Sequence, residues 1–241
     1  MKIKSIIIAT VLLVFGCCKT ATAQLFKANV SAGFAISQID GDELYGFKHL
    51  GFSGGVGVMM PIIPDKTDEG FQLSTEILLS QRGATNNHLT DPFEYHCNLT
   101  YIDVPLMIHY VDKRGGVTLG AGIQYGRLIS TKESWTLYDT MINGMDRPLN
   151  INDHNFKKND LSVVADFRFT IWRNFKFDVR WQYSLLPIRK DVGFFNSYNP
   201  DDDYYKSWYR DYKTHSLTFK VIYVFNEDND TYHRTKYRRR R

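Results

Sequence analysis

The chain has 241 residues, with 30 Lys and Arg against 26 Asp and Glu, and 15% of its residues are aromatic. This length suits one domain or two, and we expect one because no Pro-, Gly- or Ser-rich linker divides the chain. After the first residues no stretch is long and apolar enough for a membrane-spanning helix, which excludes a helical membrane protein.

Residues 1–23 are predicted to be an export signal that is removed. Lys2 and Lys4 precede the apolar run SIIIATVLLVF, and Ala21-Thr22-Ala23 is a small-x-small cleavage site, so the mature chain would begin at Gln24. Loss of the signal removes three lysines and lowers the formal charge from +4 to +1.

The run VFGCC allows a second interpretation, a lipoprotein signal cut before Cys17, although Phe15 is bulky for such a signal. With the signal removed, Cys97 is the one cysteine left, so no internal disulfide is expected. A large sheet or core must then hold the exported protein together.

Eight segments alternate apolar and polar residues with period 2, the pattern of β-strands. In chain order they are FKANVSAGFAIS (26–37), GFSGGVGVMMP (51–61), FQLSTEILLSQ (71–81), YIDVPLMIHY (101–110), GVTLGAGIQYGRLIS (116–130), DLSVVADFRFTI (160–171), FKFDVRWQYSL (175–185) and SLTFKVIYVF (216–225). Several reach ten residues or more, the length at which a tilted strand crosses a bilayer. Pro105 lacks an N–H, which predicts a bulge or weak pairing at that position.

The connections between these segments alternate in length. The long ones are 38–49, 82–98, 131–159 and 187–214, and the short ones are 62–69, 112–115 and 173–174. In an up-and-down sheet alternate connections lie at the same end, so all long loops gather at one end. Outer-membrane barrels have this asymmetry, with long loops outside the cell and short turns in the periplasm.

We therefore predict an all-β protein, an eight-stranded antiparallel transmembrane barrel over residues 24–225, in the outer membrane of a Gram-negative bacterium. Its apolar strand faces would touch lipid, because a spanning sheet must close on itself. The alternative is a lipocalin-like soluble barrel, in which the apolar faces point inward. Long loops would be extracellular and both termini periplasmic.

The polar strand faces would then line the lumen. Eight strands leave room for little but side chains, and buried charges must be paired. The predicted lumen ion-pair cluster is Glu76, Asp103, Asp166, Arg168, Lys176, Asp178, Arg180 and Lys220, with His109 nearby. A polar path for a small solute or proton is the alternative. Gly120, Gly122 and Gly126 share the inward parity and would relieve crowding.

Outward aromatic residues suit the girdles of an interface with lipid. The predicted girdle residues are Trp181, Tyr183, Tyr223 and Phe225. The long loops are also rich in Tyr, Trp, Arg and Asp, which either bind a protein partner or cap the barrel mouth.

No pattern predicts a catalytic residue, a cofactor or a metal site. GAGIQYG has the wrong spacing for a dinucleotide-binding turn, and the histidines lack metal-binding spacing. Asp201, Asp202 and Asp203 form a solvated acidic loop or a cation site. Ser130 and His215 leave open a lipid-A-modifying enzyme, but no pairing between them is readable from the sequence.

Residues 226–241 form a basic tail that we expect to be disordered and periplasmic. Arg238, Arg239, Arg240 and Arg241 would bind lipid phosphate, acidic envelope groups or a partner protein. Nucleic acid is not expected in that compartment.

The segments LSTEILLSQRGA, YIDVPLMIHY, GAGIQYGRLIS and FKFDVRWQYSL resemble the PorT-type outer-membrane β-barrel proteins. The residues that match the family pattern are Glu76, Ser80, Gln81, Gly83, Tyr101, Asp103, Pro105 and Leu106. The resemblance implies a barrel without enzymatic activity that serves as an accessory component of type IX protein secretion. Its expected partners are outer-membrane lipid and secretion-machinery or envelope proteins. A stand-alone barrel for adhesion or envelope integrity is the competing function.

Overall fold

In the part of the chain that it describes, the computed structural model contains nine β-strands. It describes residues 26–42, 46–63, 69–86, 93–137, 156–194, 208–225 and 227, so the expected export signal lies outside it, as does the basic tail apart from residue 227. The strands are β1 (Lys27–Asp40), β2 (His49–Pro61), β3 (Gly70–Thr85), β4 (Phe93–Asp112), β5 (Val117–Leu137), β6 (Asn159–Trp172), β7 (Phe175–Ser184), β8 (Arg189–Phe194) and β9 (Trp208–Val224). Within these ranges no helix is long and apolar enough to cross a membrane.

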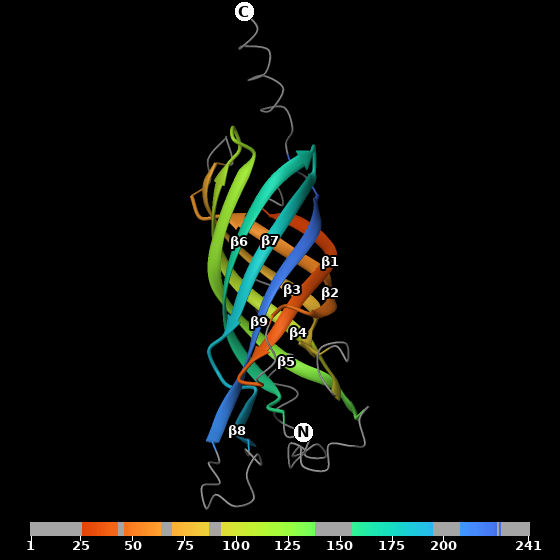
Figure 1. Ribbon diagram of the computed structural model, residues 1–241. Coiled ribbons are helices and arrows are strands. Elements are labelled where there is room, and N and C mark those ends of the chain that lie inside the picture. Colours follow the sequence, from red (N-terminus) through yellow and green to blue (C-terminus); the bar gives the residue numbers. More distant parts are fainter. Residues whose placement is uncertain are drawn as a thin grey trace, which may run out of the picture.

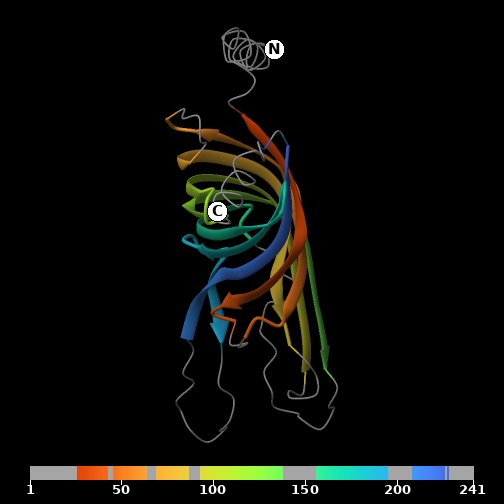
Figure 2. The same ribbon diagram turned by 90° about the horizontal axis from the view of Figure 1, so that it is seen from above.

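Eight of the strands close into an antiparallel barrel, which confirms the predicted fold. Strands β1 to β7 pair in chain order, β7 pairs with β9, and β9 closes the ring by pairing with β1 from Asn29↔Val224 to Asp40↔Lys213. Figures 1 and 2 show the strands inclined around a common axis. We call the end with the tight connections 113–116 and 173–174 the turn end and the opposite end the loop end.

The polar faces of the strands point into the barrel and the apolar faces point out. On β7, Asp178 and Arg180 are 0% and 2% exposed, whereas Phe175 and Trp181 are 37% and 41% exposed. The alternation holds along the strand, because successive side chains of a strand point to opposite faces. The orientation predicted from FKFDVRWQYSL is therefore correct, and the lipocalin-like alternative is wrong.

The outward face changes from apolar to polar partway along the strands. On β4 the outward residues are apolar from Ile102 to Tyr110, and they are polar at His96, Asn98 and Thr100. On β3 the outward face is largely apolar from Phe71 to Leu79. We call this belt of outward apolar residues the apolar band, and its height of about nine residues per strand matches what a tilted strand needs to cross a bilayer.

Beyond the apolar band the wall continues toward the loop end. β4 and β5 have 20 and 21 residues, about twice the length needed to span a bilayer. β8, unpredicted from the sequence, pairs with the loop-end part of β9. We call this part of the wall the loop-end extension, and Figure 1 shows β8 and the far end of β5 projecting there.

The predicted loops 82–98, 131–159 and 187–214 are thus partly strand. They were wrongly assigned because the polarity of the two faces inverts above the apolar band. Tyr95, Cys97 and Leu99 point inward and are buried there, while polar residues point outward. The alternation of outward apolar and inward polar residues within the apolar band therefore does not continue into the residues beyond it.

Pro105 interrupts the β3–β4 ladder, as predicted. Pairing continues to Thr75↔Leu106 and resumes at Leu78↔Asp103 without a change of register. On the other side of β4 Pro105 pairs with Gln124. The irregularity that shifts the register lies elsewhere, between Thr100 and Tyr101 against β5. Weak pairing at Pro105 is confirmed, and a bulge at that position is not what the structure shows.

The loop-end extension encloses an apolar core. Its buried members come from β1, β3, β4, β9 and the segments before β6 and β8: Ile39, Ala84, Tyr95, Cys97, Leu99, Tyr101, Phe156, Ile188 and Tyr212. Arg189 reaches Glu133 across this core at 3.6 Å. The extension therefore has the construction of a soluble β-domain, with an apolar interior and a polar exterior.

Cys97 is expected to resist thiol reagents while the barrel is folded. Burial raises the pKa of its thiol to about 12, so little of the reactive thiolate exists near neutral pH. A maleimide at pH 7.5 should label the urea-unfolded protein and leave the folded protein unlabelled over the same time. Ser134→Cys in a Cys97→Ala background is the control, because Ser134 is exposed and should react in the folded state. Rapid labelling of folded Cys97 would contradict the packing of this core.

Candidate functional site

The charged lumen is the candidate site, and all eight predicted lumen residues have side chains on the inward faces of the strands. The structure divides them into three groups rather than one cluster. Glu76, Asp166, Arg168, Asp178, Arg180 and Lys220 form the largest group, which we call the central ion cluster. Asp103 and Lys176 belong to the other two groups.

The central ion cluster joins opposite walls of the barrel through Glu76. β3 and β7 are four strands apart in a ring of eight, and Arg180 of β7 donates two hydrogen bonds to Glu76 of β3, both of 3.0 Å. Arg168 also donates to Glu76 at 3.0 Å, and the Lys220 Nζ lies 3.5 Å from it. One buried carboxylate thus holds three cations that come from three strands.

The remaining carboxylates balance the charge of the cluster. Asp166 accepts from Arg168 at 2.7 Å and from Arg180 at 3.1 Å, and Asp178 lies 3.2 Å from the Lys220 Nζ. Three carboxylates therefore face three cations. This balance lowers the cost of burying the charges of the central ion cluster.

A second group, the loop-side ion triad, consists of Arg82, Asp103 and Asp160. The Arg82 guanidinium lies 2.6 Å from Asp103 and 3.0 Å from Asp160. Ser80 donates a short hydrogen bond to Asp103. Arg82 and Asp160 were missed from the sequence, although each has the inward parity of its strand. Extending the alternation of 71–81 by one residue would have found Arg82.

The third group lies at the turn end. Lys176 pairs with Glu227 at 2.7 Å, so the predicted lumen residue Lys176 is not in contact with the central ion cluster. A small opening is found here, and its lining comprises Lys27, Asn29, Met59, Gln72, Val111, Thr118, Arg168, Lys176, Val224 and Glu227. The opening at the turn end of the lumen is therefore small and is lined by both polar and apolar side chains.

Ser74, His109 and Asp166 form a chain of contacts inside the lumen. The His109 Nδ1 lies 3.1 Å from the Ser74 Oγ, and its Nε2 lies 3.0 Å from Asp166. These are the residue types of a nucleophile, a base and an orienting acid. Ser74 is 2% exposed and His109 is 0% exposed, so the described lumen leaves no space for a substrate at the Ser74 Oγ.

Glycines on β5 make room for these charged groups, as their inward parity predicted. A Cβ at Gly120 would lie 2.3 Å from both Asp166 and the His109 ring. A Cβ at Gly126 would lie 2.7 Å from Asp103. The space left by the missing side chains on β5 is thus filled by polar side chains of β3, β4 and β6.

Gly120→Val is expected to destabilise the barrel by about 1–3 kcal/mol, because the new side chain would overpack the contact between His109 and Asp166. The measurement is urea unfolding of the protein refolded in lipid vesicles. Ala121→Val is the matched control, since Ala121 is the next residue on β5 and is exposed on the outward face. Equal midpoints for the two variants would contradict the packing role of Gly120.

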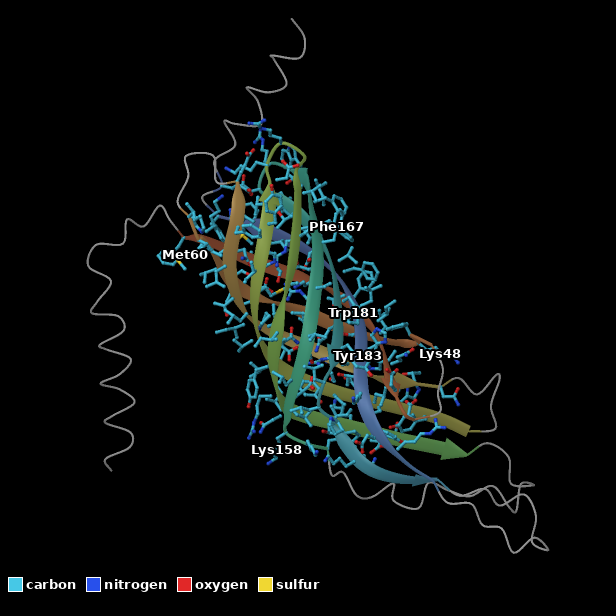
Figure 3. All side chains as sticks on the ribbon, turned by 90° about the vertical axis from the view of Figure 1, so that its left-hand side faces the viewer. Lys48, Met60, Lys158, Phe167, Trp181 and Tyr183 are labelled. Carbon is cyan, nitrogen blue, oxygen red and sulfur yellow. The ribbon has the colours of Figure 1, made fainter. Side chains whose placement is uncertain are left out.

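The predicted girdle residues lie in two separate aromatic groups outside the barrel. Tyr223 packs against Phe225 and Phe175 near the turn end, with both centroid distances 5.0 Å. Trp181 stacks on Tyr183 at 6.3 Å nearer the loop end (Figure 3). Trp181 also donates through its Nε1 to His215 at 2.7 Å.

The described residues contain no group of three or more His, Cys, Asp or Glu that could hold a metal ion. The candidate cation site Asp201, Asp202 and Asp203 and the basic tail Arg238 to Arg241 lie outside the described ranges. Ser130 is on β5 and His215 on β9, with β6 and β7 between them in the ring, so the structure does not bring this pair together.

Three solved structures are among those found to be similar to this chain. Among solved structures, Ail of Yersinia pestis, determined in complex with the heparin analogue sucrose octasulfate, is 13% identical, with 83% of this chain and 99% of that chain covered and a TM-score of 0.40. Neisserial surface protein A is 13% identical, with 83% and 97% covered and a TM-score of 0.38. OprG of Pseudomonas aeruginosa is 12% identical, with 83% and 95% covered and a TM-score of 0.34.

No curated protein matches the sequence. A family model described as outer membrane protein beta-barrel domain matches residues 8–225, which is most of the chain. The closed antiparallel barrel described above agrees with this family. The chain therefore belongs to the outer membrane protein β-barrel domain family and is a transmembrane β-barrel of a Gram-negative outer membrane.

Proposed function

We propose that this barrel is a non-conducting and non-enzymatic accessory component of protein secretion that binds a protein partner through its loop-end extension. The filled lumen carries the proposal. The central ion cluster joins opposite walls, and the apolar core around Tyr95 and Leu99 lies above it. A barrel filled in this way has its outer surface and its extension available for function. The PorT-type resemblance supports the assignment to type IX secretion.

The proposed orientation places the loop end outside the cell and both termini in the periplasm. It is supported by the sorting of connections, because the tight turns of outer-membrane barrels lie in the periplasm. Two cysteine variants test it in a Cys97→Ala background. An impermeant maleimide added to intact cells should label Ser134→Cys at the loop end and should not label Arg173→Cys at the turn end. The reverse result would contradict the orientation.

A stand-alone barrel for adhesion or envelope integrity is the second candidate. The same extension favours it, because β4 and β5 continue well beyond the apolar band and present a rigid polar surface. A lipid-A-modifying enzyme has less support, since Ser130 and His215 are three strands apart and Ser74 is buried.

Gene deletion separates the candidates. Loss of cargo proteins from the culture medium, restored by the wild-type gene, is the expected result. Normal cargo secretion together with a leaky or less adhesive envelope would contradict the secretion role and support the second candidate. A crosslinker placed at Ser134 should capture a protein partner that one placed at Arg173 does not.

A further inference from the structure

A group of four exposed cations lies on one side of the barrel, at the loop-side edge of the apolar band. Arg127 and Lys132 are on β5, and Lys157 and Lys158 precede β6; we call these four residues the basic patch. The main chains of β5 and of the segment before β6 are in contact there, since the Leu128 N–H donates a hydrogen bond of 2.8 Å to the Lys158 carbonyl. Figure 3 shows Lys158 near the loop end of the wall.

The height of the basic patch is fixed by pairing between strands. Arg127 pairs with Ile102, which is the last outward apolar residue of β4 before the face becomes polar. Lys132 pairs with Asn98, four residues further along β4, or about 13 Å along the strand. The patch therefore begins where the hydrocarbon ends and continues through the layer occupied by lipid headgroups.

The Arg127 guanidinium is held in position. It donates to the Asn159 Oδ1 at 2.5 Å, and the same oxygen accepts the Tyr125 hydroxyl at 2.9 Å. Tyr125 is half exposed on the outward face below Arg127, so an aromatic ring anchors the apolar edge of the patch. The fixed guanidinium needs little ordering before it binds an anion.

The charge of the basic patch is not compensated within the described part of the chain. None of its four cations forms an ion pair with a carboxylate of the described residues. On the opposite wall, by contrast, Lys213 of β9 is the direct cross-strand neighbour of Asp40 of β1. A carboxylate therefore lies beside Lys213, whereas the cross-strand neighbours of Arg127 and Lys132 are Ile102, Asn159 and Asn98.

We propose that the basic patch binds the phosphate groups of a glycolipid anchored in the leaflet at the loop end. Guanidinium and ammonium groups form charge-assisted hydrogen bonds to phosphate, and cations at two heights suit a headgroup with more than one phosphate. This inference rests on the proposed orientation, which places the loop end in the outer leaflet. It does not depend on the secretion role, which is tested in cells.

The test compares two double variants of the full mature protein in phosphatidylcholine nanodiscs that contain diphosphoryl lipid A. Arg127→Gln with Lys158→Gln should weaken lipid A binding about 25-fold, since a cation near a charged lipid surface contributes about fivefold in affinity. Lys48→Gln with Lys213→Gln removes the same charge at the same end of the opposite wall and should change binding less than about threefold. Native mass spectrometry counts the lipid A retained by each protein.

The probes separate the phosphates of the glycolipid from anionic lipid in general. Monophosphoryl lipid A should bind more weakly than diphosphoryl lipid A, and phosphatidylglycerol should not distinguish the two double variants. Equal lipid A binding by both variants would overturn the proposal, as would the same loss for phosphatidylglycerol. Circular dichroism and heat-modifiable gel migration verify that both variants are folded, so a loss of binding reports on the patch.

Discussion

Glu76→Gln should lower the free energy of unfolding by about 3–5 kcal/mol, the cost of breaking a buried ion pair by removing one partner. Arg168, Arg180 and Lys220 all lie within 3.5 Å of the Glu76 carboxylate, so the variant leaves three buried cations facing two carboxylates. Urea unfolding in lipid vesicles, followed by tryptophan fluorescence, measures the change.

Glu69→Gln is the control for Glu76→Gln. Glu69 is partly exposed and pairs with the exposed Arg114 at 3.6 Å, and such surface pairs contribute at most about 1 kcal/mol. Adding Lys220→Met to Glu76→Gln restores equal numbers of charges, so the double variant should be less unstable than the sum of the two single variants. Additive effects would show that the central ion cluster is not energetically coupled.

Ile123→Arg should destabilise the barrel by about 2–4 kcal/mol, because it places a cation in the apolar band facing hydrocarbon. Ile123 lies on β5, points outward from the barrel and is 52% exposed. The measurement is again urea unfolding in vesicles, and the loss should shrink when the same variant is studied in a short-chain detergent micelle, which deforms around a charge.

Ser134→Arg is the matched control, on the same outward face of the same strand. Ser134 pairs with His96, above the apolar band, so the added cation remains in water and should change stability by less than about 0.5 kcal/mol. Ile123 and Ser134 both point outward although one has an odd and the other an even residue number, because the register of β5 shifts opposite Thr100 and Tyr101. A large loss at Ser134 would mean that lipid covers the loop-end extension as well.

Alternation, strand length and the sorting of long and short connections were together sufficient to predict the barrel and the direction of its side chains. The period of 2 predicts that Phe175 and Trp181 lie on one face of the strand and that Asp178 and Arg180 lie on the other. The closure of the sheet follows from the rule that backbone groups in lipid must be fully hydrogen-bonded. The inward glycines of β5 and the weak ladder at Pro105 were predictable for the same reason. Each of these features depends on one strand and its nearest neighbours.

The grouping of the lumen charges was not predictable, because it depends on contacts across the barrel. Whether Asp103 meets Arg82 or Arg180 is decided by the stagger of the strands around the closed ring, which no single strand encodes. Asp103 and Lys176 have the same inward parity as Glu76, yet the structure places them in other groups. Sequence parity gives the face of a residue but not its height or its partner.

The loop-end extension was missed for a different reason. Because apolar residues were expected on the outside at every height, His96 and Asn98 were assigned to the loop 82–98. The outward residues of β4 change from apolar to polar at Thr100, and the inward residues change from polar to apolar beyond it. A search for strands whose two faces exchange polarity would have found this region.

The seam between β1 and β9 has a consequence for biogenesis. β1, the first of the described strands in the chain, has β9, the last of them, as one of its two neighbours, and the two strands share twelve paired positions from Asn29↔Val224 to Asp40↔Lys213. In a polypeptide that ended before Trp208, backbone N–H and C=O groups of β1 would face acyl chains without hydrogen-bond partners. Insertion must therefore wait for the complete chain or rely on an assembly factor that temporarily covers this edge.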